Sequence, residues 1–396
     1  MRDLFLLDPE IIFMNHGSFG ATPAAVFEVY QRWQRDLERQ PVEFLGRRYD
    51  DLLRQTRIRL AAYVHTDPAN LVYLSNATAG VNTVARSLKL EPGDQILMTD
   101  HEYGACENTW RYVCERSGAE LIRQAIPLPL PDPTAIVDLL WQRVTPQTKL
   151  IFISHITSPT GLIFPVEEVC RRAREAGILT LIDGAHVPGQ LPLNLDELGA
   201  DFYTGNLHKW LCAPKGAAFL YVRPEHQPLI APLVIGWGYT DRMFSTTMVY
   251  TTERPFAERH QWLGTLDPAA WLSVPAAIDF QEEHHWDDVR QVCHGVAIET
   301  QARLAELTGL TPVVPETAFG QMVLSPLPPG DPVILKRRLY DEYKVEVPIT
   351  TWNGQNYVRV SIQGYNTRAD VDQLIEAFKA LLEKTDESES KSPVVP

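Results

Sequence analysis

Short apolar runs alternate with amphipathic stretches between about residues 70 and 225, and this alternation constrains the fold more than any other feature. Strand-like runs occupy residues 71–75, 95–99, 150–154, 178–182 and 217–222. Helical stretches occupy residues 78–88, 103–117 and 166–176. Such alternation is typical of a mainly parallel sheet with helices on its faces. We therefore expect an α/β fold whose ligand binds beyond the carboxyl ends of the strands.

The pattern changes after about residue 285. Helical stretches at 286–308, 333–343 and 368–382 enclose short strand-like runs at 345–349 and 357–362, which predicts a smaller α+β domain. The length of 396 residues suits one large domain plus a small one. We divide the chain into an N-terminal segment (1–15), a large domain (16–284), a small C-terminal domain (285–384) and a polar tail (385–396) that we expect to be disordered.

An aspartate and a lysine end two successive strand-like runs of the large domain. The first run, residues 178–182, ends at Asp183. The second run begins at Asp201 and leads into Asn206-Leu-His-Lys209. A lysine in this position can form a Schiff base with the aldehyde of pyridoxal phosphate (PLP). An ionised aspartate can keep the pyridine nitrogen protonated, so that the ring draws electrons from the substrate Cα. Alone, either residue is more often a surface lysine or a helix cap, but together they predict a PLP site.

Three strand-to-helix turns offer further contacts for this cofactor. The small residues of segment 75–82 let the backbone approach a phosphate at a helix N-terminus. After the next strand, both His101 and Tyr103 qualify to stack on the pyridine ring. The hydroxyl groups of segment 154–161 can reach the phenolic oxygen of the cofactor, or can simply cap the turn.

Arg359 lies in an alternating run near the end of the chain. Val358, Val360 and Ile362 point to one face of this expected strand, and Arg359 points to the other. A guanidinium group is suited to bidentate binding of a substrate carboxylate. The alternative is a surface arginine on an edge strand.

Charge and apolar content argue against several kinds of partner. The net charge is 36 minus 50, or −14, which disfavours nucleic acid and anionic membranes. No stretch approaches 18 apolar residues, so we expect no membrane span. The cluster of His284, His285, Cys293 and His294 resembles a set of metal ligands. It contains no Cys-x-x-Cys pair, so we expect solvated helix residues and no metal.

The cysteines do not indicate a disulfide framework. Their number is odd and their spacing irregular, which favours reduced thiols in a cytoplasmic protein. The sequence assigns no role to any of them: Cys106, Cys114, Cys170, Cys212 and Cys293.

Taken together, these motifs resemble those of the class V aminotransferase family of PLP enzymes, in its isopenicillin N epimerase-like branch. That branch also includes hercynylcysteine sulfoxide lyase-type enzymes. The resemblance covers nearly all of residues 10–384. Its most specific segments are Met14-Asn-His-Gly-Ser-Phe-Gly20, Asp100-His-Glu-Tyr-Gly104, Ile156-Thr-Ser-Pro-Thr-Gly161, Asp183-Gly-Ala-His186 and Thr204-Gly-Asn-Leu-His-Lys-Trp210.

The resemblance implies the PLP-dependent transferase fold type I, with a seven-stranded, mainly parallel sheet and a homodimer whose sites lie at the interface. It also implies a role for each matching residue. Lys209 would be the Schiff-base lysine, Asp183 the pyridinium partner and Tyr103 the stacking ring. The other roles are phenolic-oxygen contact by His186 and Ser158, phosphate binding by Ala77, Thr78, Asn206 and His208, phosphate contact from the neighbouring subunit by Thr265, carboxylate binding by Arg359, and a substrate border formed by Asn15, His16 and Gly17.

The implied chemistry is a reaction at the Cα of an amino acid, through an external aldimine and a carbanion, with Lys209 moving the Cα proton. Reprotonation on the other face would give epimerisation, loss of a β-substituent would give a C–S lyase, and a second half-reaction with a keto acid would give transamination. The motifs do not separate these three outcomes. Cysteine desulfurases of the family carry a nucleophilic cysteine shortly before the carboxylate arginine, and residues 346–357 contain none. A catalytically idle PLP-binding protein is the alternative from another class, and the intact set of Lys209, Asp183 and Arg359 argues against it.

Overall fold

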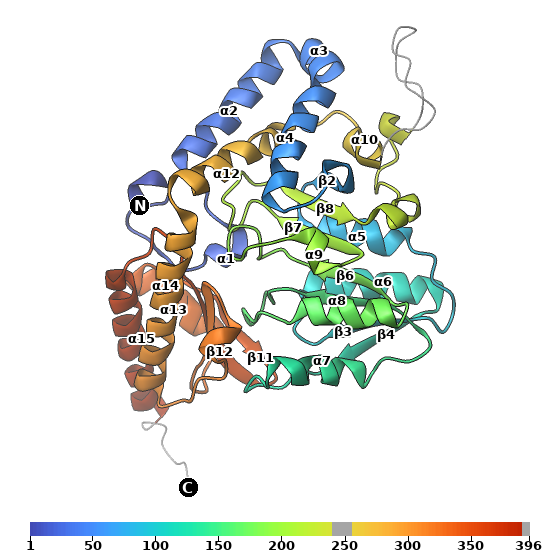
Figure 1. The fold of residues 1–396 in the computed structure, drawn as a ribbon. Helices are drawn as coiled ribbons and strands as arrows, with labels where there is room; N and C mark the ends of the chain where they lie inside the picture. Colours follow the sequence, from blue (N-terminus) through green and yellow to red (C-terminus); the bar gives the residue numbers. More distant parts are fainter. Residues whose placement is uncertain (240–255, 390–396) are drawn as a thin grey trace.

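The computed structural model describes residues 1–239 and 256–389, and its centre is a seven-stranded sheet (Figure 1). The strand order is β2-β8-β7-β6-β5-β3-β4, and β8 is antiparallel to both of its neighbours whereas the other pairs are parallel. The prediction of a mainly parallel seven-stranded sheet is confirmed. The strands are β2 (Leu71–Leu74), β3 (Gln95–Thr99), β4 (Glu120–Gln124), β5 (Thr148–Ser154), β6 (Leu179–Asp183), β7 (Phe202–Asn206) and β8 (Ala218–Val222).

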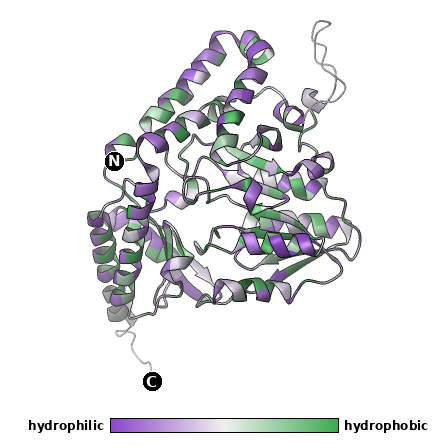
Figure 2. Cartoon of the chain, viewed as in Figure 1, coloured by the Kyte–Doolittle hydropathy of each residue, from purple (hydrophilic) through white to green (hydrophobic). Residues whose placement is uncertain are grey.

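Both faces of this sheet are buried, as β5 illustrates. Leu150 and Phe152 point into a core shared with α5 (Ala77–Ser87) and α6 (Gly104–Ser117). Ile151 and Ile153 point the other way, into a core shared with α7 (Pro133–Trp141) and α8 (Val166–Glu175). A strand buried on both faces reads as a continuous apolar run, which is the pattern that predicted it. Figure 2 shows hydrophobic strands inside and a largely hydrophilic α8 outside.

A second group of helices packs around the antiparallel edge of the sheet. In Figure 1 the blue helices α2, α3 and α4 project beyond β2 and β8, beside the yellow-orange α12. Helix α11 contacts α2 and α4, and α12 contacts the same two helices. These helices are α2 (Ala24–Arg39), α3 (Pro41–Glu43), α4 (Tyr49–Tyr63), α10 (Phe256–Gln261), α11 (Ala269–Leu272) and α12 (Val274–Glu283).

The C-terminal elements form a smaller α+β unit to one side of the main sheet (Figure 1). Its three-stranded antiparallel sheet has the order β11-β12-β9. Val358 and Val360 are fully buried on one face of β12, and Arg359 lies on the other face, against the large domain. The elements are α13 (Trp286–Thr308), β9 (Met322–Pro326), α14 (Pro332–Tyr343), β11 (Ile349–Trp352), β12 (Gln355–Ser361) and α15 (Arg368–Glu389).

The N-terminal segment joins the small unit to the large domain. Strand β1 (Ile12–Phe13) pairs in parallel with β10 (Val345–Glu346), and the short helix α1 (His16–Phe19) follows. Gly20 then packs against the loop after β7, with φ of +70°. A Cβ at this position would lie 2.1 Å from the carbonyl oxygen of His208, so only glycine fits. The first 20 residues therefore tie both domains to the loop that carries Lys209.

The structure departs from the sequence-based expectations in several places. The strand expected at 345–349 is divided into β10 and β11, because Pro348 between them has no N–H for a strand ladder. Helix α15 continues to Glu389 and so includes the first five residues, 385–389, of the segment expected to be a disordered tail; residues 384–389 contain no Pro or Gly to end the helix. Residues 390–396 lie outside the described residues. Strands β4 and β9 were not anticipated.

The structure shows where the five cysteines and the candidate metal cluster lie. All five cysteines are buried free thiols. Cys293 was expected to be solvated and is instead in the core, because its side of α13 packs inward, and His294 bonds to the Gly320 carbonyl. Within the described ranges, no helix is both long enough and apolar enough to cross a membrane.

Candidate active site

A cavity of about 370 Å³ opens at the carboxyl ends of β5, β6 and β7, the edge at which a ligand was predicted. It brings together residues from six separate segments of the chain. Those of its lining residues that the sequence singled out are Ala77, Thr78, Tyr103, Ser158, Asp183, His186, Asn206, His208 and Lys209. The remaining lining residues had no individual role predicted, although Ser75, Asn76, Ser154 and Ile156 lie in the predicted segments 75–82 and 154–161; these residues are Ser18, Phe19, Ser75, Asn76, Ser154, Ile156, Ala185 and Gly216.

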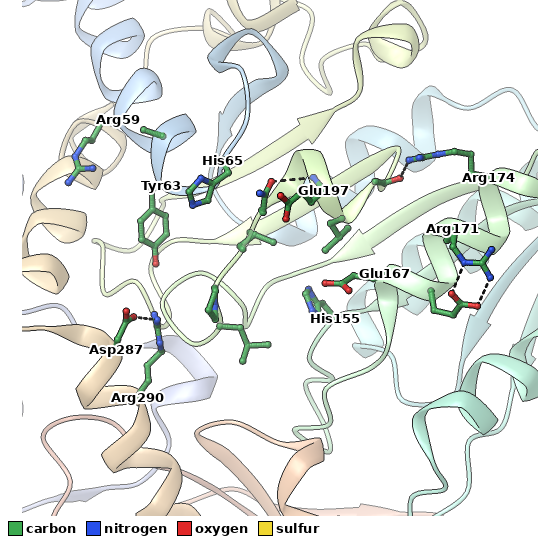
Figure 3. Close-up of a pocket in the computed structure, with 18 of the residues that line it drawn as sticks. Arg59, Tyr63, His65, His155, Glu167, Arg171, Arg174, Glu197, Asp287 and Arg290 are labelled. Carbon is green, nitrogen blue, oxygen red and sulfur yellow. Dashed lines mark hydrogen bonds and ion pairs between the residues drawn. The ribbon is translucent and has the colours of Figure 1, made fainter.

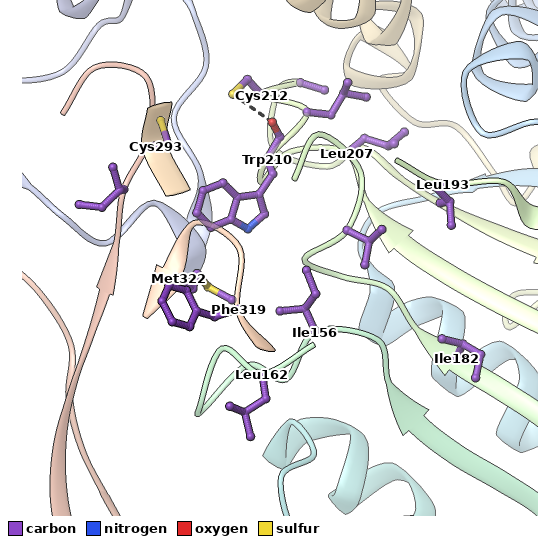
Figure 4. Close-up of a cluster of buried hydrophobic side chains, with 14 of the residues drawn as sticks. Ile156, Leu162, Ile182, Leu193, Leu207, Trp210, Cys212, Cys293, Phe319 and Met322 are labelled. Atoms are coloured by element: carbon purple, nitrogen blue, oxygen red, sulfur yellow. Dashed lines mark hydrogen bonds between the residues drawn. The ribbon is translucent and has the colours of Figure 1, made fainter. Parts of the chain in front are cut away.

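Lys209 is held by an anchored loop. Leu207 and Trp210, on either side of the His208-Lys209 pair, are fully buried in the apolar cluster shown in Figure 4. The backbone carbonyl of Lys209 accepts hydrogen bonds from His16 Nε2 (3.0 Å) and from the amide of Cys212 (3.0 Å). The backbone at Lys209 is therefore fixed, and the side chain extends from it. Its Nζ lies 3.1 Å from His186 Nε2.

Burial and a neighbouring cation favour the neutral form of the Lys209 amine. Burial, followed by the positive charge of Arg359, lowers the pKa of Lys209 from 10.5 to about 7, although the charge of Asp183 opposes this. A protonated amine has no lone pair with which to attack a carbonyl. Near neutral pH, Lys209 is therefore available as a nucleophile or base to an extent that an exposed lysine is not.

Asp183 is a buried carboxylate that lacks a cationic partner. Its side chain is 4% exposed, and burial raises its pKa. Oδ1 accepts a hydrogen bond from the amide of Ala185 (2.9 Å), and Oδ2 accepts one from the thiol of Cys106 (3.6 Å). Within the described residues, no Lys, Arg or His nitrogen comes within 4.0 Å of it. Because a buried charge requires pairing, this site fits a ligand that brings a protonated nitrogen.

His186 is held in one tautomer. It is buried, and burial followed by the positive charges of Lys209 and Arg359 moves its pKa well below 6.5, so the ring is neutral. Nδ1 accepts a hydrogen bond from Trp210 Nε1 (3.3 Å), which leaves the proton on Nε2. His186 can therefore donate a hydrogen bond from Nε2 into the cavity.

The N-terminus of α5 forms another wall of the cavity. The amide of Ala77 donates to Asn206 Oδ1 (2.8 Å), which fixes the start of the helix against the end of β7. Gly80 permits this closeness, because a Cβ there would lie 2.2 Å from Thr204 Oγ1. A helix N-terminus presents amide groups and a positive dipole end to an anion. This wall therefore fits a phosphate, as the sequence predicted.

The structure distinguishes between the two rings considered for stacking. His101 is fully buried, and both of its nitrogens are bonded, Nδ1 to Thr160 Oγ1 (2.9 Å) and Nε2 to the Ile126 carbonyl (2.8 Å). Tyr103 lines the cavity and is 46% exposed. Only Tyr103 is free to face a ligand.

The N-terminal segment borders the cavity through residues other than those expected. His16 is fully buried, bonded to Tyr365 as well as to the Lys209 loop. A Cβ on Gly17 would lie 2.5 Å from Met322 Sδ, so this residue is in a packed interior. Asn15 bonds to Glu346 (2.9 Å). Asn15, His16 and Gly17 are therefore not among the residues that line the cavity. The next two residues, Ser18 and Phe19, which form the second half of α1, line it instead.

Arg359 approaches the cavity from the small domain. It is 6% exposed, and its guanidinium group donates to the carbonyl of Ser158 and to Ser18 Oγ (3.4 Å), both from residues of the cavity wall. Its Nε has no hydrogen-bond partner, and no carboxylate in the described ranges lies within ion-pair distance of it. Burial lowers its pKa to about 10, so it stays charged near neutral pH. A buried cation without an anion fits a carboxylate ligand.

Two further residues lie outside the cavity wall, Thr265, which the sequence predicted as a site residue, and Glu102, which it did not. Thr265 is exposed and does not line this cavity. Glu102, which the sequence did not single out, is buried beneath the site: Oε1 accepts from Thr99 Oγ1 (2.6 Å), and Oε2 accepts from the Ser154 amide (2.9 Å) and hydroxyl (2.6 Å). Burial raises its pKa to about 7. Its position directly before Tyr103 was the only available signal.

A larger cavity, of about 1380 Å³, lies elsewhere, between α4, α8 and α13 (Figure 3). None of the predicted site residues line it. Three of its four lining arginines are paired with carboxylates, Arg59 with Glu282, Arg171 with Glu168 and Arg290 with Asp287, and the exposed Arg174 donates to the Gly199 carbonyl. Its charged groups are therefore either paired or exposed to solvent, and among the described residues this cavity has no buried, unpaired ionic group comparable to Lys209 or Asp183.

The fold and the smaller cavity together are those of a PLP-dependent enzyme. The family model described as aminotransferase class-V matches residues 20–374. The chain is 36% identical over 395 residues to isopenicillin N epimerase from Streptomyces clavuligerus, covering 96% of this chain and 97% of that protein. The chain therefore belongs to the class V aminotransferase family, and the prediction of a PLP enzyme is confirmed at this level.

More distant relatives carry other activities. Hercynylcysteine sulfoxide lyase from Schizosaccharomyces pombe is 24% identical over 382 residues, covering 96% of each chain. Among solved structures, a mutant of C-DES with glycine covalently linked to its PLP cofactor superimposes with a TM-score of 0.84, at 20% identity, over 94% of this chain and 97% of that one. At this identity the structural likeness concerns the fold alone.

We predict that Lys209 reacts with PLP with a pH midpoint near 7. The attachment rate should rise with pH and level off above about 7, because the neutral amine is the nucleophile. Arg359→Gln should move the midpoint upward by removing a nearby positive charge. The measurement is the rate of PLP uptake by the apoprotein, trapped with borohydride and mapped by peptide mass. Lys215, whose amine bonds to the Gly20 carbonyl, is the internal control. A midpoint near 10, or label on Lys215, would contradict the assignment.

Proposed function

We propose that this chain acts at the Cα of an amino acid, with PLP bound in the Lys209 cavity. The observation that carries the proposal is a lysine with a pKa of about 7 in the same cavity as a buried aspartate that lacks a cation. When bound, PLP would supply a ring that stabilises negative charge at the substrate Cα. Binding of the cofactor and substrate, and transfer of the Cα proton, would be performed by residues of this chain.

The cavity residues divide the work of holding the cofactor. Asp183 would bind the protonated ring nitrogen, and Tyr103 would cover the ring face. His186, whose proton is on Nε2, would donate to the phenolic oxygen with the help of Ser158. The phosphate would bind at the N-terminus of α5. The residues around the phosphate are Ala77, Thr78, Asn206 and His208.

Arg359 would bind the substrate carboxylate. It is buried, charged and without an anion, and it already contacts Ser18 and Ser158 on the cavity wall. A substrate held there would place its Cα between Arg359 and the Lys209 amine. Lys209 would then take the Cα proton, a role that suits a base with a pKa near the working pH.

Epimerisation is the reaction we favour. The epimerase relative matches at 36% identity over almost the whole length of both chains, whereas the sulfoxide lyase matches at 24%. Epimerisation requires that the proton return to the opposite face of Cα. A C–S lyase acting on an S-substituted cysteine is the second candidate, since it would use the same lysine and arginine and differ only in losing the β-substituent.

The cysteines disfavour persulfide chemistry. No cysteine lines the cavity, and none follows Cys293 in the chain. A thiol nucleophile for sulfur transfer is therefore missing from the loop before Arg359. The five free thiols also support a reducing compartment such as the cytoplasm, which thiol titration of protein from intact cells would test.

A homodimer with shared sites is part of the proposal. Phe19 (74% exposed) and Tyr103 (46% exposed) leave aromatic surface at the cavity mouth. Exposed apolar surface beside a site is typical of a protein interface. A second copy covering this mouth would bring its Thr265 to the phosphate.

The reaction is predicted to be Cα inversion. In D₂O, the PLP-loaded enzyme should exchange the Cα proton of an accepted amino acid and produce both enantiomers, without releasing pyruvate or ammonia. The screen should include isopenicillin N, L-amino acids and S-substituted cysteines, with Lys209→Ala as the inactive control. Pyruvate release from an S-substituted cysteine would establish the lyase instead. Absorbance unchanged by every compound would indicate an idle PLP-binding protein.

Arg359→Lys should weaken amino-acid binding by about 1–3 kcal/mol, because an ammonium group cannot hold both carboxylate oxygens. PLP content should stay at the wild-type level. The measurement is a titration of the cofactor absorbance with an accepted amino acid. Arg368→Lys is the matched control, since Arg368 is exposed and pairs with Glu299 on the same small domain. Equal affinities in wild type and Arg359→Lys would place the carboxylate elsewhere.

Thr265 is predicted to act across the dimer. Thr265→Ala should weaken PLP binding by about five- to tenfold, the loss of one hydrogen bond. A mixed dimer of a Lys209→Ala subunit and a Thr265→Ala subunit has a single lysine site. If Thr265 acts in trans, that site has a wild-type threonine and should bind PLP with wild-type affinity. Affinity equal to that of the Thr265→Ala homodimer would show that the contact is within one chain or absent.

A further inference from the structure

The first turn of α6 touches both the cavity and the buried carboxylate. Tyr103 caps this helix and lines the cavity, and the amide of Cys106 donates to the Tyr103 carbonyl (2.8 Å). Residues three apart share a face of a helix. The Cys106 thiol accordingly lies on the side of the site, where Sγ donates to Asp183 Oδ2 at 3.6 Å.

The two donors on Asp183 come from different parts of the fold. Ala185 belongs to the same loop as the aspartate, so its amide follows any movement of that loop. Cys106 comes from the helix after β3, two strands away in the sheet. The thiol is therefore the contact that ties the end of β6 to α6 at the carboxylate itself.

Cys106 is restricted to the role of a donor. It has no exposed surface, and burial, followed by the negative charge of Asp183, raises its pKa well above the ordinary value for a thiol. It therefore stays protonated and does not react with solvent oxidants as a thiolate would. A thiol is also a weak donor, so it can orient a carboxylate while leaving most of its negative charge available.

We propose that Cys106 is a positioning residue that fixes the Asp183 carboxylate, so that its remaining lone pairs face the ring nitrogen of the cofactor. This inference rests on the proposed function, because it assumes that Asp183 binds that nitrogen. It adds a residue that belongs to none of the motifs from which the site was predicted.

Other ionisable groups also act on Asp183, and the test must hold them constant. Glu102 lies beneath it in the turn before α6, Lys209 and His186 share its cavity, and Tyr203 faces it from β7. None of these groups differs between the variants below. Cys114 supplies the control, since it is buried on the same helix and in the same core as Cys106 but has no contact with Asp183.

The first measurement uses the apoprotein. The infrared S–H band of Cys106, obtained as the difference between wild type and Cys106→Ser, should lie at the lower frequency of a thiol bonded to a carboxylate. Asp183→Asn should move this band upward, because an amide oxygen is a weaker acceptor. A band that is the same in both proteins would overturn the contact. This result does not depend on cofactor binding.

The second measurement uses the PLP-loaded enzyme. Cys106→Ala should weaken PLP affinity about five- to tenfold and move the ¹⁵N signal of labelled ring nitrogen away from its protonated value. Cys106→Ser, which keeps a donor, should restore both, and Cys114→Ser should change neither. Wild-type affinity and ring signal in Cys106→Ala would overturn the positioning role. If wild-type protein bound no PLP, the proposed function would fail, while the infrared result would still decide the thiol–carboxylate contact.

Discussion

Two buried ionisable groups, the Lys209 amine and the Asp183 carboxylate, share a cavity without forming an ion pair, and the rest of the site depends on this separation. Each group loses hydration on folding, and the attraction between them offsets only part of this loss. The cost appears as a lowered pKa for Lys209 and a raised one for Asp183. Apolar packing of the main sheet offsets this cost, because its strands are buried on both faces and hold the ends of β6 and β7 at fixed positions. A ligand that brings both an aldehyde and a protonated nitrogen would relieve both groups at once.

The N-terminal segment connects this cavity to the small domain. Strand β1 pairs with β10 of the small domain. His16 bonds to Tyr365 and to the Lys209 carbonyl, and Ser18 accepts a hydrogen bond from Arg359. A shift of the small domain would therefore move the loop that carries Lys209 as well as Arg359. This arrangement places substrate recognition and the reacting amine on one continuous set of hydrogen bonds, with Gly20 allowing the segment to approach the loop closely.

Family membership and reaction type rest on different features. Over almost its whole length the chain is similar to one relative named as an epimerase and to another named as a sulfoxide lyase. The choice between inversion and elimination depends on which groups face Cα and the β-substituent. If the substrate carboxylate binds Arg359 as proposed, the nearest wall residues are Ser18 and Ser158, which contact the guanidinium group. We therefore propose that the cavity wall near Arg359 decides the reaction, whereas the residues at the strand ends hold the cofactor.

The sequence by itself determined the mainly parallel sheet and the edge at which the cavity opens, and it predicted roles for Lys209 and Asp183, because apolar periodicity and short motifs are local. It also gave the alternation around Arg359, and both faces of β12 agree with it. Only the tertiary structure decided that Tyr103 and not His101 faces the cavity, that Ser18 and Phe19 replace His16 and Gly17 on its wall, and that Glu102 and Cys106 lie beneath it. These facts depend on contacts between segments up to hundreds of residues apart. Such contacts are set by how helices and loops pack on the sheet, which no local pattern encodes.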